Sequence, residues 1–323
     1  MSVINDSTAE VSLIYQQIYL VALTEGTILK LVFIIIMSLF FIYVNAIMVY
    51  TLWSKPVFKE TPRYILFNHM ILNDSVQLFV TALLYIFGVA YIKLFMAGCA
   101  FAVIASGATF RNTPLNLALM SLERYVAIRF PLRHAEIATQ KRTYIAIGVI
   151  WFLGLVQYLI DLFYGTLMDP TFLTIQKFCT REMLFIKQWQ VDLEKGVNIF
   201  FFVSVSTIIL FTYVSILITT RSAISSKKDT ATKAHKTVLL HLIQLGFCLT
   251  SFLYSIIERA AAMASSNSNL FIELQYITYL LMLILPRCLS PLIYGLRDNA
   301  VRPLFIYYFR CTPCKCRSTV SVH

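Results

Sequence analysis

Long, continuous runs of apolar residues alternate with short polar linkers along the 323-residue chain. A helix that crosses the hydrocarbon core of a bilayer needs about 20 mostly apolar residues. Seven stretches meet this requirement: Thr27–Trp53, Tyr64–Tyr91, Gly98–Leu122, Thr143–Leu167, Gly196–Thr220, Thr237–Met263 and Phe271–Tyr294. A transmembrane β-barrel would alternate with period two, which these runs do not. The pattern therefore predicts an all-α membrane protein, a seven-transmembrane helix bundle.

The same pattern divides the chain into three parts. Residues 1–26 form a polar N-terminal tail, residues 27–294 form the helix bundle, and residues 295–323 form a tail. We expect this last tail to begin with a short amphipathic helix. The first apolar run is too long for a cleaved signal peptide, and no small-residue cleavage site follows it.

Composition and charge agree with this class and set the orientation. Hydrophobic residues make up 59% and charged residues 13% of the chain, with a mean hydropathy of +0.74, whereas soluble domains carry about 25% charge. Lys and Arg concentrate in the linkers after the first, third and fifth runs and in the C-terminal tail. The positive-inside rule makes that side cytoplasmic. We expect a multi-pass plasma-membrane protein, surrounded by membrane lipids, with its N-terminus outside. The net charge of +11 then reflects topology, not a nucleic-acid partner, which would need a basic face on a soluble fold.

Two features belong to the expected outer side. Cys99 opens the third run and Cys179 lies in the linker between the fourth and fifth runs. They are either two free thiols or a disulfide, and the oxidising environment favours the disulfide. Asn5 begins an Asn-X-Ser sequon in the outer tail, which predicts glycosylation. The sequon at Asn73 lies inside a run and is expected to stay unmodified.

Three cysteines follow the last run, at Cys311, Cys314 and Cys316. Cysteines beside a membrane in a basic context favour palmitoylation. A zinc site is the alternative, but a fourth ligand is missing nearby except for His323, and no modification is the third possibility. We therefore predict no bound metal and no cofactor.

Three sequence motifs occur at the third, sixth and seventh apolar runs. The third run ends with Met120-Ser121-Leu122-Glu123-Arg124-Tyr125-Val126-Ala127-Ile128, followed by Pro131-Leu132. The sixth begins with Lys233-Ala234-His235-Lys236-Thr237, followed by His241-Leu242, and the seventh contains Pro286-Arg287-Cys288-Leu289-Ser290-Pro291-Leu292-Ile293-Tyr294. In these motifs the chain resembles odorant (olfactory) receptors of the rhodopsin-like class of G-protein-coupled receptors, over about residues 25–310. The segment Phe58–Leu66 is further similar to a branch of these receptors found in fish.

The resemblance implies a function. An odorant receptor binds an extracellular small-molecule odorant between its helices and activates a stimulatory heterotrimeric G protein, which gives cyclic AMP signalling. It is not an enzyme. One alternative is a rhodopsin-like receptor for a non-olfactory ligand. Another is a secondary transporter, although such proteins tend to contain internal repeats and the sequence has none.

The resemblance also implies residues for G-protein coupling and activation. These are Glu123, Arg124, Tyr125, Tyr213, His241, Pro291 and Tyr294. We expect Glu123 and Arg124 to form an ion pair that breaks when a partner protein inserts. Pro291 interrupts the helix hydrogen bonds, so Tyr294 can swing towards Tyr213 or His241. The alternatives are that Arg124 is only a positive-inside anchor and Tyr213 only an interfacial aromatic residue.

Buried charges form two predicted groups. At the rise of about 1.5 Å per residue, Asp74 and Arg287 reach one depth, together with Asn45 and Ser290. An unpaired charge at that depth is costly, so we predict an Asp74–Arg287 pair within a buried polar network. Ser290 stands where the family has Asn.

Arg111 lies near mid-bilayer and has two interpretations. It either pairs with Asp161 of the fourth run, or faces the ligand and binds a carboxylate with both arms of its guanidinium. Bundle ligands lie in mostly apolar sites with few polar groups. The residues at a matching depth give the candidate ligand-binding set, although each can also be plain helix packing: Ser106, Gly107, Phe110, Arg111, Tyr254, Glu258, Tyr276, Tyr279 and Leu280.

Overall fold

The computed structural model describes residues 25–90, 92–223, 246, 273–274, 276–295 and 298–311. Its long helices are α2 (Glu25–Trp53), α4 (Pro62–Val89), α5 (Met96–Arg129), α7 (Gln140–Met168), α8 (Gln188–Ala223), α12 (Leu285–Gly295) and α13 (Val301–Cys311). The shorter elements are α3 (Pro56–Glu60), α6 (His134–Ile137), the 3₁₀ helix η1 (Arg181–Leu184), the π-helix η2 (Tyr279–Ile284), β1 (Lys93–Phe95) and β2 (Gln176–Phe178). The first five predicted spans are α2, α4, α5, α7 and α8, and η2 with α12 falls within the seventh. The sixth span lies almost wholly outside the described residues.

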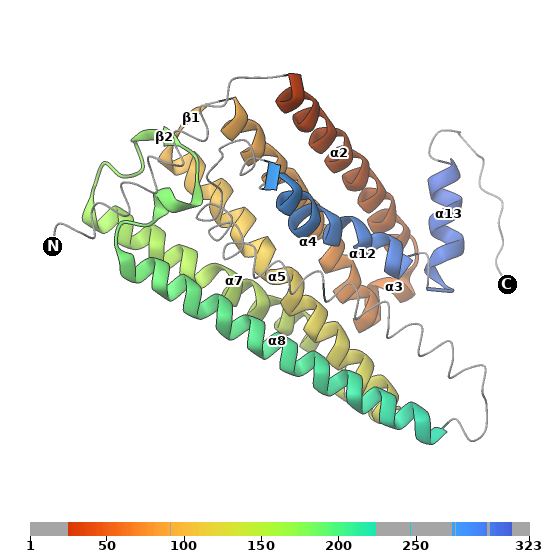
Figure 1. The fold of residues 1–323 in the computed structure, drawn as a ribbon. Helices are drawn as coiled ribbons and strands as arrows, with labels where there is room; N and C mark the ends of the chain where they lie inside the picture. The colour runs from red at the N-terminus through yellow and green to blue at the C-terminus, as the bar shows by residue number, and fades with distance from the viewer. Residues whose placement is uncertain are drawn as a thin grey trace.

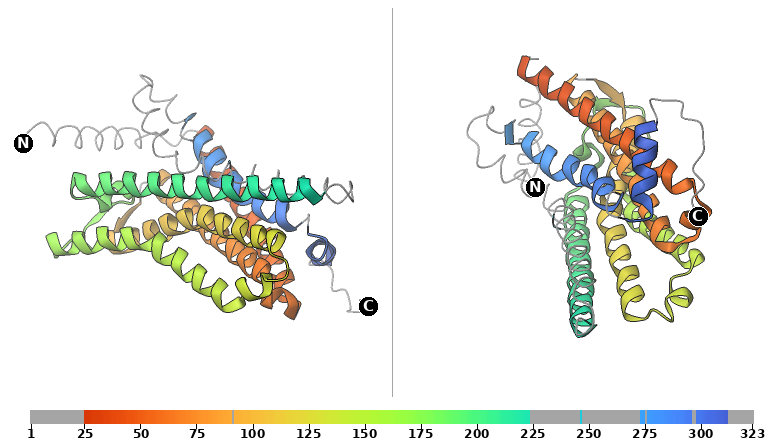
Figure 2. Two further views of the ribbon diagram at one scale, coloured as in Figure 1. Left: turned by 90° about the horizontal axis from the view of Figure 1, so that it is seen from below. Right: turned by 90° about the vertical axis from the view of Figure 1, so that its right-hand side faces the viewer.

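Helix α5 occupies the middle of the bundle. It contacts α4, α7 and α8, while α2 packs on the far side of α4 and α12 lies beside both α2 and α4 (Figure 1). Helix α13 follows α12, packs against α2 and runs across the bundle, so that it is seen end-on where α8 lies along the page (Figure 2). The chain therefore folds as a transmembrane helix bundle followed by a short crosswise helix, as the sequence predicts.

Apolar side chains cover the outside of this bundle. Phe79, Phe163 and Phe200, on α4, α7 and α8, are 60–66% exposed, which only a lipid environment makes favourable. Four described helices are long and apolar enough to cross a membrane: Gly26–Trp53, Pro62–Gly88, Gln140–Met168 and Gln188–Thr219. Helix α5 is not among them, because its central position lets it bury polar residues such as Asn112 and Asn116 against its neighbours.

Local sequence explains where several helices begin. Proline stands in the first turn of both α3 and α4, where its missing N–H costs nothing. Helix α7 begins after Thr139, whose hydroxyl accepts a hydrogen bond from the backbone N–H of Arg142. These signals fix the short connections on the basic side of the bundle.

A two-stranded sheet lies at the opposite end of the bundle. Strands β1 and β2 are antiparallel, with Lys93 opposite Phe178 and Phe95 opposite Gln176. Sequence analysis did not predict this pairing, because each strand has only three residues. This pairing brings the linker after α7 back over the start of α5.

Candidate functional site

Close approach of α5 and α7 shapes the outer half of the candidate site. A Cβ atom added at Gly107 of α5 would overlap the ring of Tyr158 on α7, and one added at Gly154 would meet the side chain of Asn112. Small residues let two membrane helices approach closely. Gly107, which belongs to the predicted ligand-binding set, therefore packs against Tyr158 and determines the spacing of the two helices.

Arg111 lies beside this contact and is only 1% exposed. Its Nη2 donates to Oε1 of Gln157 at 2.6 Å, and its Nε donates to Oδ1 of Asn198 at 3.3 Å. The guanidinium lies 4.6 Å from the centre of the Tyr158 ring, a favourable cation–π geometry. Its contacts are thus with neutral groups of α7 and α8. Of the two interpretations of Arg111, the direct pair with Asp161 is not formed, because amide side chains occupy the positions nearest to each charge.

Asp161 is fully buried one turn beyond Gln157 on α7. Its Oδ1 accepts a hydrogen bond from Nε2 of Gln190 at 3.0 Å. The Oε1 of Gln190 accepts the backbone N–H groups of Ile186 and Lys187 at 2.8 and 3.0 Å. Gln190 therefore ties the start of α8 to Asp161. Sequence reasoning missed Gln190, although a polar residue in the first turn of a span signals such a role.

The outer linker completes this group. Cys99 and Cys179 form the predicted disulfide, with their Cα atoms 5.3 Å apart. Two residues after Cys179, Arg181 forms an ion pair with Glu194 of α8, and its Nη2 donates to the hydroxyl of Tyr158 at 3.0 Å. Its guanidinium lies 5.5 Å from the same ring that Arg111 contacts. The disulfide thus holds the linker in a position where Arg181 contacts the same Tyr158 ring as Arg111.

The predicted buried network lies deeper, between α2, α4, α5 and α12. Asn45, Asp74, Arg287 and Ser290 are all 0% exposed. Asp74 accepts a hydrogen bond from the hydroxyl of Thr113 at 3.0 Å and another from the hydroxyl of Ser290. Asn45 donates to Ser75 at 3.0 Å and so joins α2 to α4. Hydroxyl groups therefore supply the described hydrogen bonds of the Asp74 carboxylate.

Arg287 does not form the predicted ion pair with Asp74. Its Nη1 donates to the backbone carbonyl of Met282 at 3.0 Å. In a regular α-helix that carbonyl would accept the N–H of the fourth residue on, which is Pro286 and has none. The π-helix η2 precedes this proline. The Arg287 guanidinium replaces the missing donor, which explains why it points to its own helix and does not contact Asp74 directly, although its charge lies near that carboxylate.

The other residues of the predicted ligand-binding set do not lie together in one group. Phe110 of α5 lies under Arg287, whose guanidinium is 5.4 Å from the ring centre. The ring of Tyr279 stacks on Tyr85 of α4 at 5.3 Å. Three members, Tyr276, Tyr279 and Leu280, belong to an apolar cluster with residues of α2 and α4. Ser106 is half-buried on α5, and Tyr254 and Glu258 lie outside the described residues.

At the end of α5 that we expect to be cytoplasmic, Glu123 has a partner in α6. Its Oε1 lies 3.0 Å from Nε2 of His134 in α6, a contact that sequence reasoning missed. The ring of Tyr125 contacts Phe211 of α8 at 5.4 Å. Tyr213 is half-buried on α8. In the sequence, Arg124 lies between Glu123 and Tyr125. The end of α5 therefore lies against both α6 and α8.

Three further activation residues belong to the last two spans. Pro291 lies inside α12, and Tyr294 is near its end. His241 lies outside the described residues, as do Asn5, Cys314 and Cys316, while Cys311 ends α13. Their predicted roles stay predictions.

A polar relay connects α4, α5 and α7. The indole nitrogen of Trp151 donates to Nε2 of His69 at 2.9 Å, and Nδ1 of His69 lies 3.2 Å from Oδ1 of Asn116. Asn116 also donates to the carbonyl of Leu66 at 3.0 Å. Sequence reasoning missed this relay. Among the described residues, no three His, Cys, Asp or Glu side chains form a group that could hold a metal.

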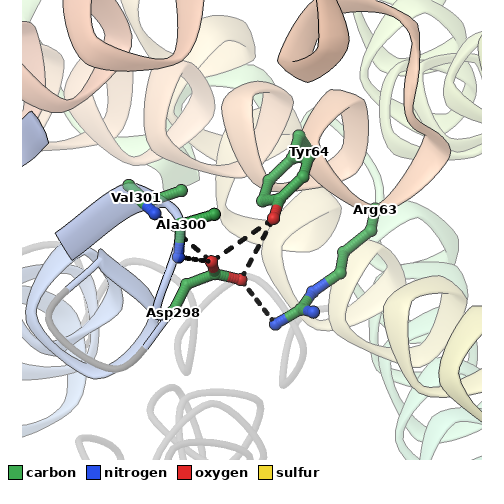
Figure 3. A network of polar contacts seen from close by, with 5 residues as sticks. All are labelled: Arg63, Tyr64, Asp298, Ala300 and Val301. Carbon is green, nitrogen blue, oxygen red and sulfur yellow. Dashed lines mark hydrogen bonds and ion pairs between the residues drawn. The ribbon is translucent and has the colours of Figure 1, made fainter. Parts of the chain in front are cut away.

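Asp298 joins α13 to the bundle (Figure 3). Its Oδ1 accepts the backbone N–H groups of Ala300 and Val301 at 2.9 and 3.3 Å, which caps the helix. Its Oδ2 lies 2.9 Å from Nη2 of Arg63, and the hydroxyl of Tyr64 lies 3.3 Å from Oδ1. The crosswise helix is thus held to the start of α4.

Comparisons with known proteins agree with this architecture. A family model described as the seven-transmembrane receptor, rhodopsin family, matches residues 44–294. The chain is 30% identical over 277 residues to Odorant receptor 131-2 of Danio rerio, covering 85% of this chain and 84% of that protein. It is 27% identical over 208 residues to Olfactory receptor 52A5 of Homo sapiens, covering 60% and 61%.

Proposed function

Because the chain belongs to the rhodopsin family of seven-transmembrane receptors and is homologous to odorant receptors, we propose that it binds an extracellular small-molecule odorant and activates a stimulatory heterotrimeric G protein. The signal is a rise in cyclic AMP. The receptor lies in the plasma membrane with its N-terminus outside, because its basic linkers then face the cytoplasm.

One observation carries the ligand assignment. The polar group around Arg111 lies in the outer half of the bundle, between α5, α7 and α8, beneath a linker held by the Cys99–Cys179 disulfide. Ionisable residues inside a membrane are costly and usually mark a ligand or ion path. This group therefore supports a ligand that enters from outside and contacts Arg111.

The opposite end supports coupling. Glu123, Arg124 and Tyr125 stand at the inner end of α5, where Glu123 contacts His134 and Tyr125 contacts Phe211. Binding of a G protein there competes with these contacts. A ligand shifts the equilibrium only through its differential affinity for the two conformations. In this proposal Pro291 lets Tyr294 move towards Tyr213 or His241 in the active conformation.

The test measures cyclic AMP in cells that express the receptor during exposure to volatile and water-soluble compounds. We expect at least one compound to raise cyclic AMP, and an Arg124→Ala receptor at the same surface level to lose that response. A control variant, Lys195→Gln, changes a half-exposed residue on α8 and keeps the response. A receptor that responds only through another second messenger would contradict the stimulatory G protein.

A further inference from the structure

Two buried charges of opposite sign lie close together without contacting each other. Arg111 of α5 is 1% exposed and Asp161 of α7 is 0% exposed. Gln157, which accepts a hydrogen bond from Arg111, precedes Asp161 by one turn on α7, a rise of about 6 Å. Each charge is a near neighbour of the other, yet each contacts an amide.

Three side chains of this group each have an atom left for another partner. Within the described part of the chain, Nη1 of Arg111, Nε2 of Gln157 and Oδ2 of Asp161 are buried and lack a hydrogen bond. Leaving a buried polar atom unpaired is costly, and more so for a charged group. The two donors, Nη1 and Nε2, suit a carboxylate, whereas the acceptor, Oδ2, suits an ammonium group.

The balance of positive and negative side chains in this group argues against a ligand that carries a single charge. Arg111 and Arg181 are balanced by Asp161 and Glu194 around Tyr158. A monovalent acid or amine would leave this buried group with an uncompensated charge. A ligand that carries both charges keeps the balance and still satisfies the three unpaired atoms.

We propose that Arg111, Gln157 and Asp161 form a binding site for a small zwitterion, with the ligand carboxylate at Arg111 and Gln157 and its ammonium group at Asp161. The inference rests on the proposed function, because it names the chemical class of the odorant. The rise of one helical turn between Gln157 and Asp161 suits a ligand whose two charges are separated by one to three carbons.

The site has an outer boundary. The Arg181 side chain is 31% exposed, and its partner Glu194 is 8% exposed. Arg181 belongs to the linker that the Cys99–Cys179 disulfide holds in place, and Glu194 precedes Asn198, the partner of Arg111 on α8, by one turn. A ligand arriving from outside therefore meets the Arg181–Glu194 pair before Arg111.

The first test uses the full-length receptor in lipid nanodiscs and follows its thermal unfolding midpoint. The probes are L-alanine, β-alanine and 4-aminobutanoate, each beside its matched acid and amine, such as butanoate and butylamine. We expect at least one zwitterion to stabilise the receptor at a half-maximal concentration about tenfold below those of its two analogues, because it gains a second charge-assisted contact. The proposal is overturned if no zwitterion stabilises the receptor, or if an analogue does so equally well.

The second test assigns the two ends of the ligand. In Arg111→Gln the zwitterion should bind about tenfold more weakly while the amine is unaffected, and in Asp161→Asn the acid should be unaffected instead. Lys195→Gln, on the exposed face of α8, is the matched control and should leave all three affinities unchanged. Folded Arg111→Gln and Asp161→Asn receptors that keep the zwitterion affinity would overturn the site. If neither variant folds, the wild-type ligand series decides alone.

Cyclic AMP measured with the same probes separates this inference from the proposed function. A receptor that signals to neutral odorants but does not bind zwitterions refutes the site and leaves the proposed function intact. Zwitterion binding that never changes cyclic AMP in cells supports the site and contradicts the proposed coupling.

Discussion

Two arginines are buried in the bundle, and their surroundings differ in an informative way. Arg111 and Arg287 are 1% and 0% exposed, and each lies over an aromatic ring, Tyr158 or Phe110. Arg111 donates to side chains of two neighbouring helices, whereas Arg287 donates to a carbonyl of its own helix. The side-chain partners of Arg111 can rearrange around a ligand. The partner of Arg287 is fixed by the backbone at Pro286, so Arg287 depends on the conformation of the seventh span.

Helix α5 connects the two arginines. Phe110 and Arg111 are adjacent, and successive residues of a helix point about 100° apart. Phe110 faces Arg287 of α12, while Arg111 faces α7 and α8. A rotation of α5 would therefore alter both contacts together, which offers a physical route from the proposed ligand site to the seventh span.

The largest expected effect comes from removing the inner arginine. Arg287→Ala takes away the donor to the Met282 carbonyl and the cation near Asp74. We expect the free energy of unfolding to fall by about 3–5 kcal/mol, which a thermal unfolding curve and the surface level of the receptor measure. Adding Asp74→Asn should restore part of the loss, because it removes the buried negative charge. A variant with normal stability would show that Arg287 is not needed for the seventh span.

Breaking the disulfide tests the outer arginine group as a whole. Cys99→Ser releases the linker that holds Arg181 over Tyr158, and loss of a native disulfide typically costs about 2–5 kcal/mol. Cys179→Ser should give the same loss of thermal stability, and the double variant should lose no more than either single one. An additive loss in the double variant would contradict a shared bond.

A third change affects only the spacing of α5 and α7. Gly107→Ala places a methyl group against Tyr158, and overpacking of this kind costs about 1–3 kcal/mol. Gly98→Ala, on the same helix, meets nothing within 4 Å and is the matched control. We expect Gly107→Ala alone to lower the unfolding midpoint and weaken ligand binding. Equal behaviour of the two variants would show that this helix contact is not tight.

The smallest effect is expected where α13 joins α4. Asp298→Asn keeps an oxygen that can cap the helix but removes the charge facing Arg63, whose side chain is 42% exposed. The Asp298 side chain is 11% exposed, but its partner reaches solvent, and such a partly exposed ion pair contributes about 1 kcal/mol or less, so the unfolding midpoint should change little. Asp298→Ala also removes the cap and should cost about 1 kcal/mol more. Equal losses would mean that the cap contributes nothing.

Sequence reasoning succeeded where a strong local pattern decides the outcome. Continuous apolar runs predicted the described spans, and the outer positions of Cys99 and Cys179 predicted their disulfide. It failed where the partner depends on packing between distant segments. The partner of Arg111 is Gln157 rather than Asp161, one turn away on the same helix, and depth along the membrane does not resolve that difference.

The contacts of Arg287 were predictable in principle. The sequence has proline directly before Arg287, so the unsatisfied Met282 carbonyl follows from the order of residues alone. The matching depths of Asp74 and Arg287 favoured a pair, and the local carbonyl outcompeted it. The contact between Glu123 and His134 needed the short helix α6, whose four residues carry too little pattern to predict.

Cyclic AMP concentration–response curves for Arg111→Gln and Arg287→Gln, normalised to surface level, test the division between the two arginines most directly. Glutamine at position 287 keeps an N–H donor for the Met282 carbonyl, so the receptor can still fold. We predict that Arg111→Gln shifts the half-maximal ligand concentration upward by about tenfold or more without changing the ligand-independent level of cyclic AMP. Arg287→Gln should instead change the ligand-independent level, and should move the half-maximal concentration only as far as that change in conformational equilibrium requires. If both variants shift the half-maximal concentration alike, the two arginines share one role and the account is wrong.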